Sequence, residues 1–141
     1  MEAKIGILTV SDTRSEETDV SGKSVEESLR DLGLSQFTRK IVKDEVDAIA
    51  EAIVGMCADC QMVVTTGGTG FSPRDVTPEA TLRVLDKRAD NLSDLMRTSG
   101  ARSTPYAYLS RGICGVRGRT LIMNLPGSPR AVVESLEAVG H

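Results

Sequence analysis

Residues 63–70 read VVTTGGTG, and this stretch decides how the rest of the chain is interpreted. It begins as an apolar run of strand-forming residues and ends in a cluster of glycines. Glycine serves where the backbone passes through positive φ or comes close to a ligand, and a run of uncovered N–H groups can form an anion-binding concavity. We therefore expect a strand that leads into a phosphate-binding loop.

A helix start follows the glycines. Residues 74–79 read RDVTPE, with Thr77 placed as an N-cap and Pro78 at the first helical position. A strand, a glycine loop, an acidic residue and a helix start, in that order, are typical of a nucleotide or phosphate site in an α/β protein. The glycines fit neither the dinucleotide fingerprint nor the P-loop, so a tight loop without a ligand is the alternative.

Predicted strands and helices alternate along the chain. Right-handed βαβ units of this kind build a mainly parallel sheet with helices on both faces, so we predict one α/β domain over residues 1–141, a three-layer sandwich. The expected strands are residues 4–11, 38–42 and 62–66, with extended runs at 106–116 and 120–125. The expected helices are residues 23–32, 46–58, 77–87 and 91–99, and a last one that begins near residue 128.

Composition limits the classes of function. Hydrophobic residues make up 40% of the 141 residues and charged ones 26%, as in soluble globular proteins. Aromatic residues are 3%, which argues against base-stacking platforms for nucleic acid. Three cysteines fit a reducing compartment, and no apolar run approaches the length of a membrane span. We expect a cytoplasmic protein that binds small molecules and neither nucleic acid nor membrane.

Polar or glycine-rich residues follow the predicted strands at 11–13, 43–45, 65–70 and 124–128. Ligands of parallel sheets bind outside the carboxyl ends of the strands, so we expect these segments to converge. Asp12, Asp44 and Asp75 would repel an anion there unless a divalent cation bridged them, and Mg²⁺ uses one or two carboxylates plus substrate phosphates. Each acid alone could instead form a turn or a cap. Jointly they predict a Mg²⁺-dependent phosphate or nucleotide enzyme.

Five motifs occur in order and at compatible spacing from about residue 4 to the end. They read VSDT at 10–13, TTGGTG at 65–70, RDVTPEAT at 74–81, LSR at 109–111 and NLPGSP at 124–129. Together they resemble the molybdopterin adenylyltransferases, which include the bacterial MogA and MoaB proteins and the G domains of gephyrin and its plant counterpart. The octet at 74–81 is highly specific for this family.

The resemblance implies an α/β fold that assembles as a homotrimer, and a reaction in which molybdopterin and Mg-ATP give adenylyl-molybdopterin and pyrophosphate. It implies Mg²⁺ as cofactor, ATP and molybdopterin as substrates, and hand-over of the product to a molybdate insertase. By motif match, Asp44 and Asp75 are the catalytic carboxylates and the Mg²⁺ ligands. The implied substrate- and nucleotide-binding residues are Ser11, Asp12, Thr66, Gly67, Gly68, Thr69, Gly70, Ser110, Arg111, Asn124, Pro126, Gly127 and Ser128.

The chain also departs from the family pattern. Lys43 stands where relatives often have proline, and the chain ends at His141 where relatives continue, so we expect the family's final helix to be absent or short. Two alternatives stay open: a catalytically silent molybdopterin-binding or trimerising scaffold domain, and a nucleotide-dependent enzyme for another phosphorylated heterocycle. The presence of both Asp44 and Asp75 favours the adenylyltransferase.

Overall fold

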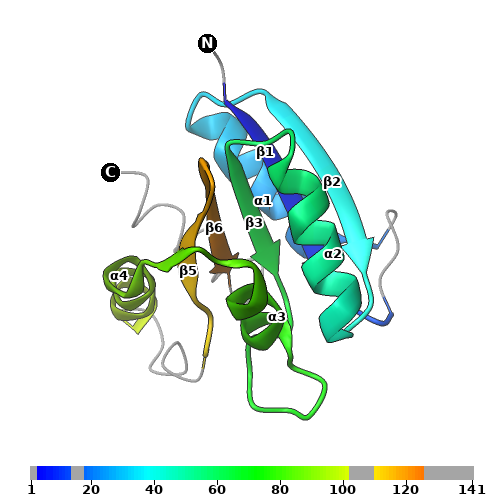
Figure 1. Ribbon diagram of the computed structural model, residues 1–141. Coiled ribbons are helices and arrows are strands. Elements are labelled where there is room, and N and C mark those ends of the chain that lie inside the picture. Colours follow the sequence, from blue (N-terminus) through cyan, green and yellow to red (C-terminus); the bar gives the residue numbers. More distant parts are fainter. Residues whose placement is uncertain (1–2, 14–17, 102–109, 126–141) are drawn as a thin grey trace.

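The computed structural model of the chain describes residues 3–13, 18–101 and 110–125, which form a six-stranded sheet with helices on both faces (Figure 1). In chain order the elements are β1 (Lys4–Val10), α1 (Val20–Asp31), β2 (Gln36–Val42), α2 (Val46–Cys57), β3 (Met62–Thr66), α3 (Thr77–Val84), β4 (Lys87–Arg88), α4 (Asp90–Ala101), β5 (Cys114–Arg117) and β6 (Thr120–Leu125).

The strand order of the sheet is β2-β1-β3-β6-β5-β4. Strands β2, β1, β3 and β6 are parallel, whereas β5 pairs with both of its neighbours in the antiparallel sense. Parallel strands need a crossover connection: α1 supplies it between the neighbours β1 and β2, and α2 leads from β2 past β1 to β3. The prediction of an α/β three-layer sandwich with a mainly parallel sheet is confirmed.

Two hydrophobic clusters fill the space between the sheet and its helical layers. Side chains alternate between the faces along β1, so Ile5 and Ile7 lie in one cluster and Leu8 and Val10 in the other. The first cluster joins the sheet to α1 and α4, and the second joins it to α2 and α3, which lie in front of the sheet in Figure 1. Coverage of both faces explains why β1 reads as a nearly continuous apolar run.

Helix α1 begins at Val20, three residues before the predicted start. Asp19 is its N-cap, and the Asp19 carboxylate accepts a hydrogen bond of 2.9 Å from the backbone N–H of Gly22. The prediction relied on apolar periodicity, which begins only at the buried Val25. The helix start is therefore set by its cap, which the periodicity does not reveal.

Helix α3 ends at Val84, earlier than predicted, and the sequence analysis missed the short strand β4 that follows it. Two residues carry no strand periodicity of their own. Pairing with β5 creates this strand, because Gly115 lets the two backbones approach closely. A Cβ atom at Gly115 would lie only 2.3 Å from the carbonyl oxygen of Lys87.

The extended run predicted over residues 106–116 is a strand only at Cys114–Arg117 within the described residues, whereas the run at 120–125 is confirmed as β6. Residues 102–109 and 126–141 lie outside the described part of the chain, and with them the predicted last helix. In the parts that the structure describes, no helix combines the length and the apolar character needed to cross a bilayer.

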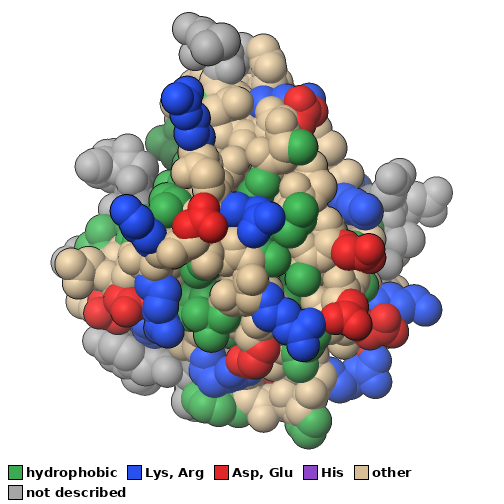
Figure 2. All heavy atoms as spheres, viewed as in Figure 1, with side chains coloured by type: hydrophobic (Ala, Val, Ile, Leu, Met, Phe, Trp, Pro, Cys, Tyr) green, Lys and Arg blue, Asp and Glu red, His purple; other side chains and the backbone are tan. Residues whose placement is uncertain are grey.

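The molecular surface over α2 and α3 carries charges of both signs. In Figure 2, Lys and Arg side chains lie interspersed with Asp and Glu side chains across this face. Such a mixed pattern suits a protein whose ligand is held in a local site better than one that binds a long polyanion through a basic stripe.

Truncation of a core side chain of the sheet tests the two-cluster packing. Leu8 is fully buried, so Leu8→Ala should lower the free energy of unfolding by about 2–5 kcal/mol. Leu82 on α3 is 43% exposed, and Leu82→Ala should lower it by less than about 1 kcal/mol. Urea denaturation of both variants checks this, and equal losses would contradict the assigned burial.

Candidate active site

The carboxyl ends of the parallel strands bring the predicted site segments to one edge of the sheet. Ser11 and Asp12 follow β1, Asp44 follows β2, and Gly67 follows β3. The Asp12 carboxylate accepts a hydrogen bond of 3.0 Å from the backbone N–H of Asp44, and the backbone N–H of Ser11 donates to the carbonyl of Val42 at 2.9 Å. The loops after β1 and β2 therefore hold each other in place.

The glycine loop needs glycine because its backbone lies directly against β1 and α3. Gly67 and Gly68 have φ values of 96° and 72°, in the region that other residues rarely adopt. A Cβ atom at Gly67 would lie 2.4 Å from the carbonyl oxygen of Val10, and one at Gly68 would lie 2.3 Å from Thr77 Oγ1. The sharp bend expected after β3 is present, and phosphate binding by this loop stays a prediction.

Thr77 fastens α3 to the glycine loop. The prediction that Thr77 is the N-cap is wrong, because Val76 holds that position and Thr77 is the first helical residue. The buried Thr77 hydroxyl donates to the carbonyl of Gly67 at 2.9 Å, and its backbone N–H donates to the carbonyl of Gly68 at 3.1 Å. The Thr77 hydroxyl thus binds a carbonyl of the loop instead of capping the N–H groups of α3.

Asp75 lies close to the last glycine of the loop. Its Oδ2 atom accepts a hydrogen bond of 3.0 Å from the backbone N–H of Ser72. The same oxygen would be 2.8 Å from a Cβ atom at Gly70, so a side chain at Gly70 would displace the carboxylate. The position of Asp75 therefore depends on the loop between residues 70 and 76.

The carboxylates of Asp44 and Asp75 act on each other electrostatically. Burial, and after it the negative charge of Asp75, raise the pKa of the Asp44 carboxyl above its ordinary value. Asp12 forms an ion pair with Arg74, whereas neither Asp44 nor Asp75 forms one with any residue that the structure describes. The site thus combines two carboxylates that form no ion pair within the described part of the chain, and Arg111 is the cation that acts on Asp75 through its charge.

This pair fits a divalent cation that is shared with a substrate. The described residues contain no group of three or more His, Cys, Asp or Glu side chains able to hold a metal by themselves. Mg²⁺ does not need one, because it binds through one or two carboxylates and completes its shell with phosphate oxygens and water. The mutual repulsion of Asp44 and Asp75 is what such an ion would relieve.

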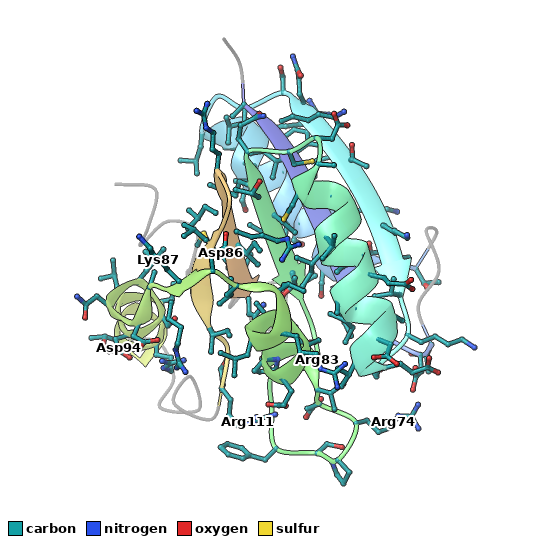
Figure 3. All side chains as sticks on the ribbon, viewed as in Figure 1. Arg74, Arg83, Asp86, Lys87, Asp94 and Arg111 are labelled. Atoms are coloured by element: carbon teal, nitrogen blue, oxygen red, sulfur yellow. The ribbon has the colours of Figure 1, made fainter. Side chains whose placement is uncertain are left out.

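Ser110 and Arg111 reach the glycine loop from the segment before β5. The Ser110 hydroxyl donates to Thr69 Oγ1 at 3.2 Å, and the backbone N–H of Arg111 donates to the carbonyl of Thr69 at 2.7 Å. The Arg111 guanidinium donates to the carbonyl of Gly70 at 2.8 Å and to that of Asp75 at 2.7 Å (Figure 3). The structure therefore places Arg111 on the protein backbone around Asp75.

Glu79 is a site residue that the sequence analysis did not select. It lies in the first turn of α3, and its carboxylate accepts from Arg111 Nη1 at 2.7 Å and from Nη2 at 3.1 Å. These hydrogen bonds are the main reason why the pKa of Glu79 is lowered. An acid within the specific octet, two residues beyond the start of a helix that follows a glycine loop, was the signal available in the sequence.

Asn124 lies beneath the site. Its side chain is 2% exposed, and Nδ2 donates to the hydroxyls of Thr65 at 2.9 Å and of Thr81 at 3.0 Å, while Oδ1 accepts from the backbone N–H of Ile113 at 3.2 Å. Both amide hydrogens are therefore used to join β6, β3 and α3. The predicted binding residues Pro126, Gly127 and Ser128 lie outside the described residues.

Ser11, Thr66 and Gly67 line a pocket of about 120 Å³ at the ends of β1 and β3. Asp19, a second residue that the sequence analysis overlooked, also lines it. Its buried carboxylate accepts from the Thr9 hydroxyl at 2.9 Å and from Arg39 Nη2 at 3.0 Å, in addition to capping α1. The signal available in the sequence was an acid shortly before a Ser-Gly pair after the first strand, which is a residue type that favours the N-cap of a helix.

Comparison with known proteins agrees with this geometry. The family described as "Probable molybdopterin binding domain" matches residues 6–141. This chain belongs to that family. The match extends from β1 through the glycine loop and both carboxylates, so it includes every segment of the candidate site.

The names of similar proteins refer to molybdopterin adenylyltransferases and molybdopterin biosynthesis enzymes. The molybdopterin adenylyltransferase of Helicobacter pylori is 44% identical over 141 residues, which cover 96% of this chain and 80% of that protein. That of Escherichia coli is 35% identical over 142 residues, covering 96% and 73%. A crystal structure of the molybdopterin biosynthesis enzyme MoaB from Thermus thermophilus gives a TM-score of 0.89 at 45% identity, covering 97% and 89%.

The resemblance predicted from the motifs is confirmed by these comparisons. They also confirm the predicted role in molybdenum cofactor biosynthesis and, at the level of the relatives' names, the prediction of a molybdopterin adenylyltransferase. The individual site residues stay predictions, because their roles rest on the motifs and on the geometry described above.

A side chain in the glycine loop should strain the fold. Gly67→Ala places a Cβ atom against a backbone oxygen at positive φ, so we expect a loss of at least about 1–3 kcal/mol in unfolding free energy. Gly55→Ala is the matched control, because an exposed glycine inside α2 has open space around it and should gain about 0.5–1 kcal/mol. Thermal unfolding of both variants checks this, and a neutral Gly67→Ala would contradict the tight approach.

The stability of the protein should depend on the ionisation of Glu79. Because the pKa of Glu79 is lowered in the folded state, its contribution is complete above the ordinary value of about 4.3 and is lost as the pH falls through the lowered value. The native protein should thus lose more stability than Glu79→Gln over this acidic range. Urea denaturation between neutral pH and about pH 3 measures it, and parallel pH profiles would refute the prediction.

Proposed function

We propose that this protein transfers the adenylyl group of Mg-ATP to molybdopterin and releases pyrophosphate. We further propose that it acts in the cytoplasm as a homotrimer and passes adenylyl-molybdopterin to a molybdate insertase. One observation carries the proposal: Asp44 and Asp75 lie beside a glycine loop at the carboxyl edge of a parallel sheet, where the negative charge of Asp75 helps to raise the pKa of Asp44. Family membership supplies the substrate class.

The proposed chemistry needs no covalent intermediate with the protein. An oxygen of the molybdopterin phosphate attacks the α-phosphorus of ATP, a new P–O bond forms, and the bond to pyrophosphate breaks. Reactions of this type depend mainly on positioning and on charge stabilisation. Mg²⁺ held by Asp44 and Asp75 would neutralise the charge of the reacting phosphates.

The remaining site residues have positioning roles in this proposal. Backbone N–H groups of residues 67–70 bind phosphate oxygens, because glycine at three of the four positions leaves them little side-chain cover. Ser11 and Thr66, which line the pocket beside the loop, bind substrate there. Asp12 braces Asp44 through its backbone N–H, so the first carboxylate keeps its orientation when the substrates arrive.

Single-turnover release of pyrophosphate from Mg-ATP in the presence of purified molybdopterin tests the proposal. Asp75→Asn and Asp44→Asn should each reduce the rate by at least about 100-fold, because each removes charge worth several kcal/mol to the transition state. Asp47→Asn is the matched control, since Asp47 is an exposed acid on α2. All three variants should fold like the native protein.

Each result separates the proposed enzyme from its alternative. Undiminished turnover in Asp75→Asn with Mg²⁺ present would remove Asp75 from the mechanism. A folded native protein that binds molybdopterin and releases no pyrophosphate would instead indicate a silent molybdopterin-binding or trimerising scaffold domain. Equilibrium binding of molybdopterin to the same samples distinguishes these two results.

A further inference from the structure

The loop that carries Asp75 has little packing of its own. We call residues 70–76 the Asp75 loop. Its four residues from Phe71 to Arg74 are exposed, and Phe71 is 68% exposed. A segment with so few buried apolar contacts has a low local stability, so its geometry must be held by polar contacts. The contacts that hold it therefore decide where the Asp75 carboxylate lies.

Arg111 contacts both ends of the Asp75 loop. Its Nε atom donates to the carbonyl of Gly70 at 2.8 Å, where the loop begins, and Nη2 donates to the carbonyl of Asp75 at 2.7 Å, near its end. The backbone N–H of Arg111 donates to the carbonyl of Thr69 at 2.7 Å, which fixes the arginine itself to the glycine loop. In Figure 3, Arg111 and Arg74 lie on the two sides of the Asp75 loop.

Glu79 orients the guanidinium for this task. Its two carboxylate oxygens accept from Nη1 at 2.7 Å and from Nη2 at 3.1 Å, the fork geometry that is strongest between arginine and a carboxylate. Glu79 belongs to the first turn of α3, which packs on the sheet. Through Arg111 it therefore attaches the loop to that helix. The guanidinium thus makes four hydrogen bonds, and it also faces the Phe71 ring, whose centroid is 5.7 Å away.

We propose that Glu79 and Arg111 are a positioning pair that fixes the Asp75 loop, and with it the Asp75 carboxylate, for adenylyl transfer. The inference rests on the proposed function for its kinetic consequence and on the described contacts for its structural one. Arg111 acts through the backbone of the loop, because four of the five N–H groups of its guanidinium are already used by the protein. Loss of either partner should therefore affect turnover more than substrate binding.

Kinetics of Glu79→Gln and Arg111→Lys test the pair. Each variant should lower kcat by about 10- to 100-fold, the effect of a misplaced catalytic group, with the KM values for ATP and molybdopterin changed less than twofold. The double variant should be no worse than the more severe single variant, because both remove one shared interaction. Asp47→Asn is the control: it breaks another Arg–carboxylate pair, between Arg83 and Asp47 at 2.8 Å, that touches no loop residue.

A second readout is independent of catalysis. The chain has no tryptophan, so Phe71→Trp places a single tryptophan in the Asp75 loop, and excitation at about 295 nm avoids the two tyrosines. Adding Glu79→Gln to this variant should lower its fluorescence anisotropy through faster loop motion, and adding Asp47→Asn should leave it unchanged. If the native protein released no pyrophosphate, the proposed function would be disproved. The anisotropy would still decide whether the pair holds the loop.

Two results would overturn the inference. An Arg111→Lys variant with an unchanged kcat and a molybdopterin KM raised tenfold or more would make Arg111 a direct substrate contact. An anisotropy that stays unchanged when Glu79→Gln is added would show that the loop is held without the pair. Circular dichroism of every variant confirms the fold on which both readings depend.

Discussion

The close approach of the glycine loop to β1 and α3 is the constraint on which the site depends. Gly67 lies against the carbonyl of Val10, and Gly68 lies against Thr77, so both positions exclude a side chain. The Thr77 hydroxyl and N–H then bind the loop carbonyls, which sets where α3 begins. Because α3 begins there, the Asp75 loop must close over a short distance. These contacts together set the position of the Asp75 carboxylate.

Beneath this edge a buried amide joins two strands to a helix through hydrogen bonds. Asn124 joins Thr65 on β3 to Thr81 on α3, and all three are buried. Buried polar groups of this kind favour one arrangement. Any shift would leave a donor or acceptor without a partner in the protein interior, where no water replaces it. The polar network therefore acts as a rigid base, and the exposed Asp75 loop rests on it.

Charge is distributed unequally around the site. Arg111 and Arg74 are each paired with a carboxylate, of Glu79 and Asp12, so two cations near the loop are already neutralised by the protein. Asp44 and Asp75 form no ion pair among the described residues, and the negative charge of Asp75 raises the pKa of Asp44. A carboxylate pair in that state favours whatever brings positive charge, and an anionic nucleotide can share such a charge only through a cation. In the proposed reaction this arrangement would link metal binding to nucleotide binding.

The sequence by itself determined the α/β class, the strands β1, β3 and β6 to within a residue, and the family. Apolar runs, glycines and a specific octet are local patterns, so they can be interpreted without knowledge of the fold. Only the tertiary structure decided that Asp19 accepts from Thr9 and Arg39, that Lys87–Arg88 forms β4 by pairing with β5, and that Glu79 accepts from Arg111. Each of these depends on a partner distant in the chain. Periodicity cannot report such partners, because a hydrogen bond is formed by the positions of atoms in space.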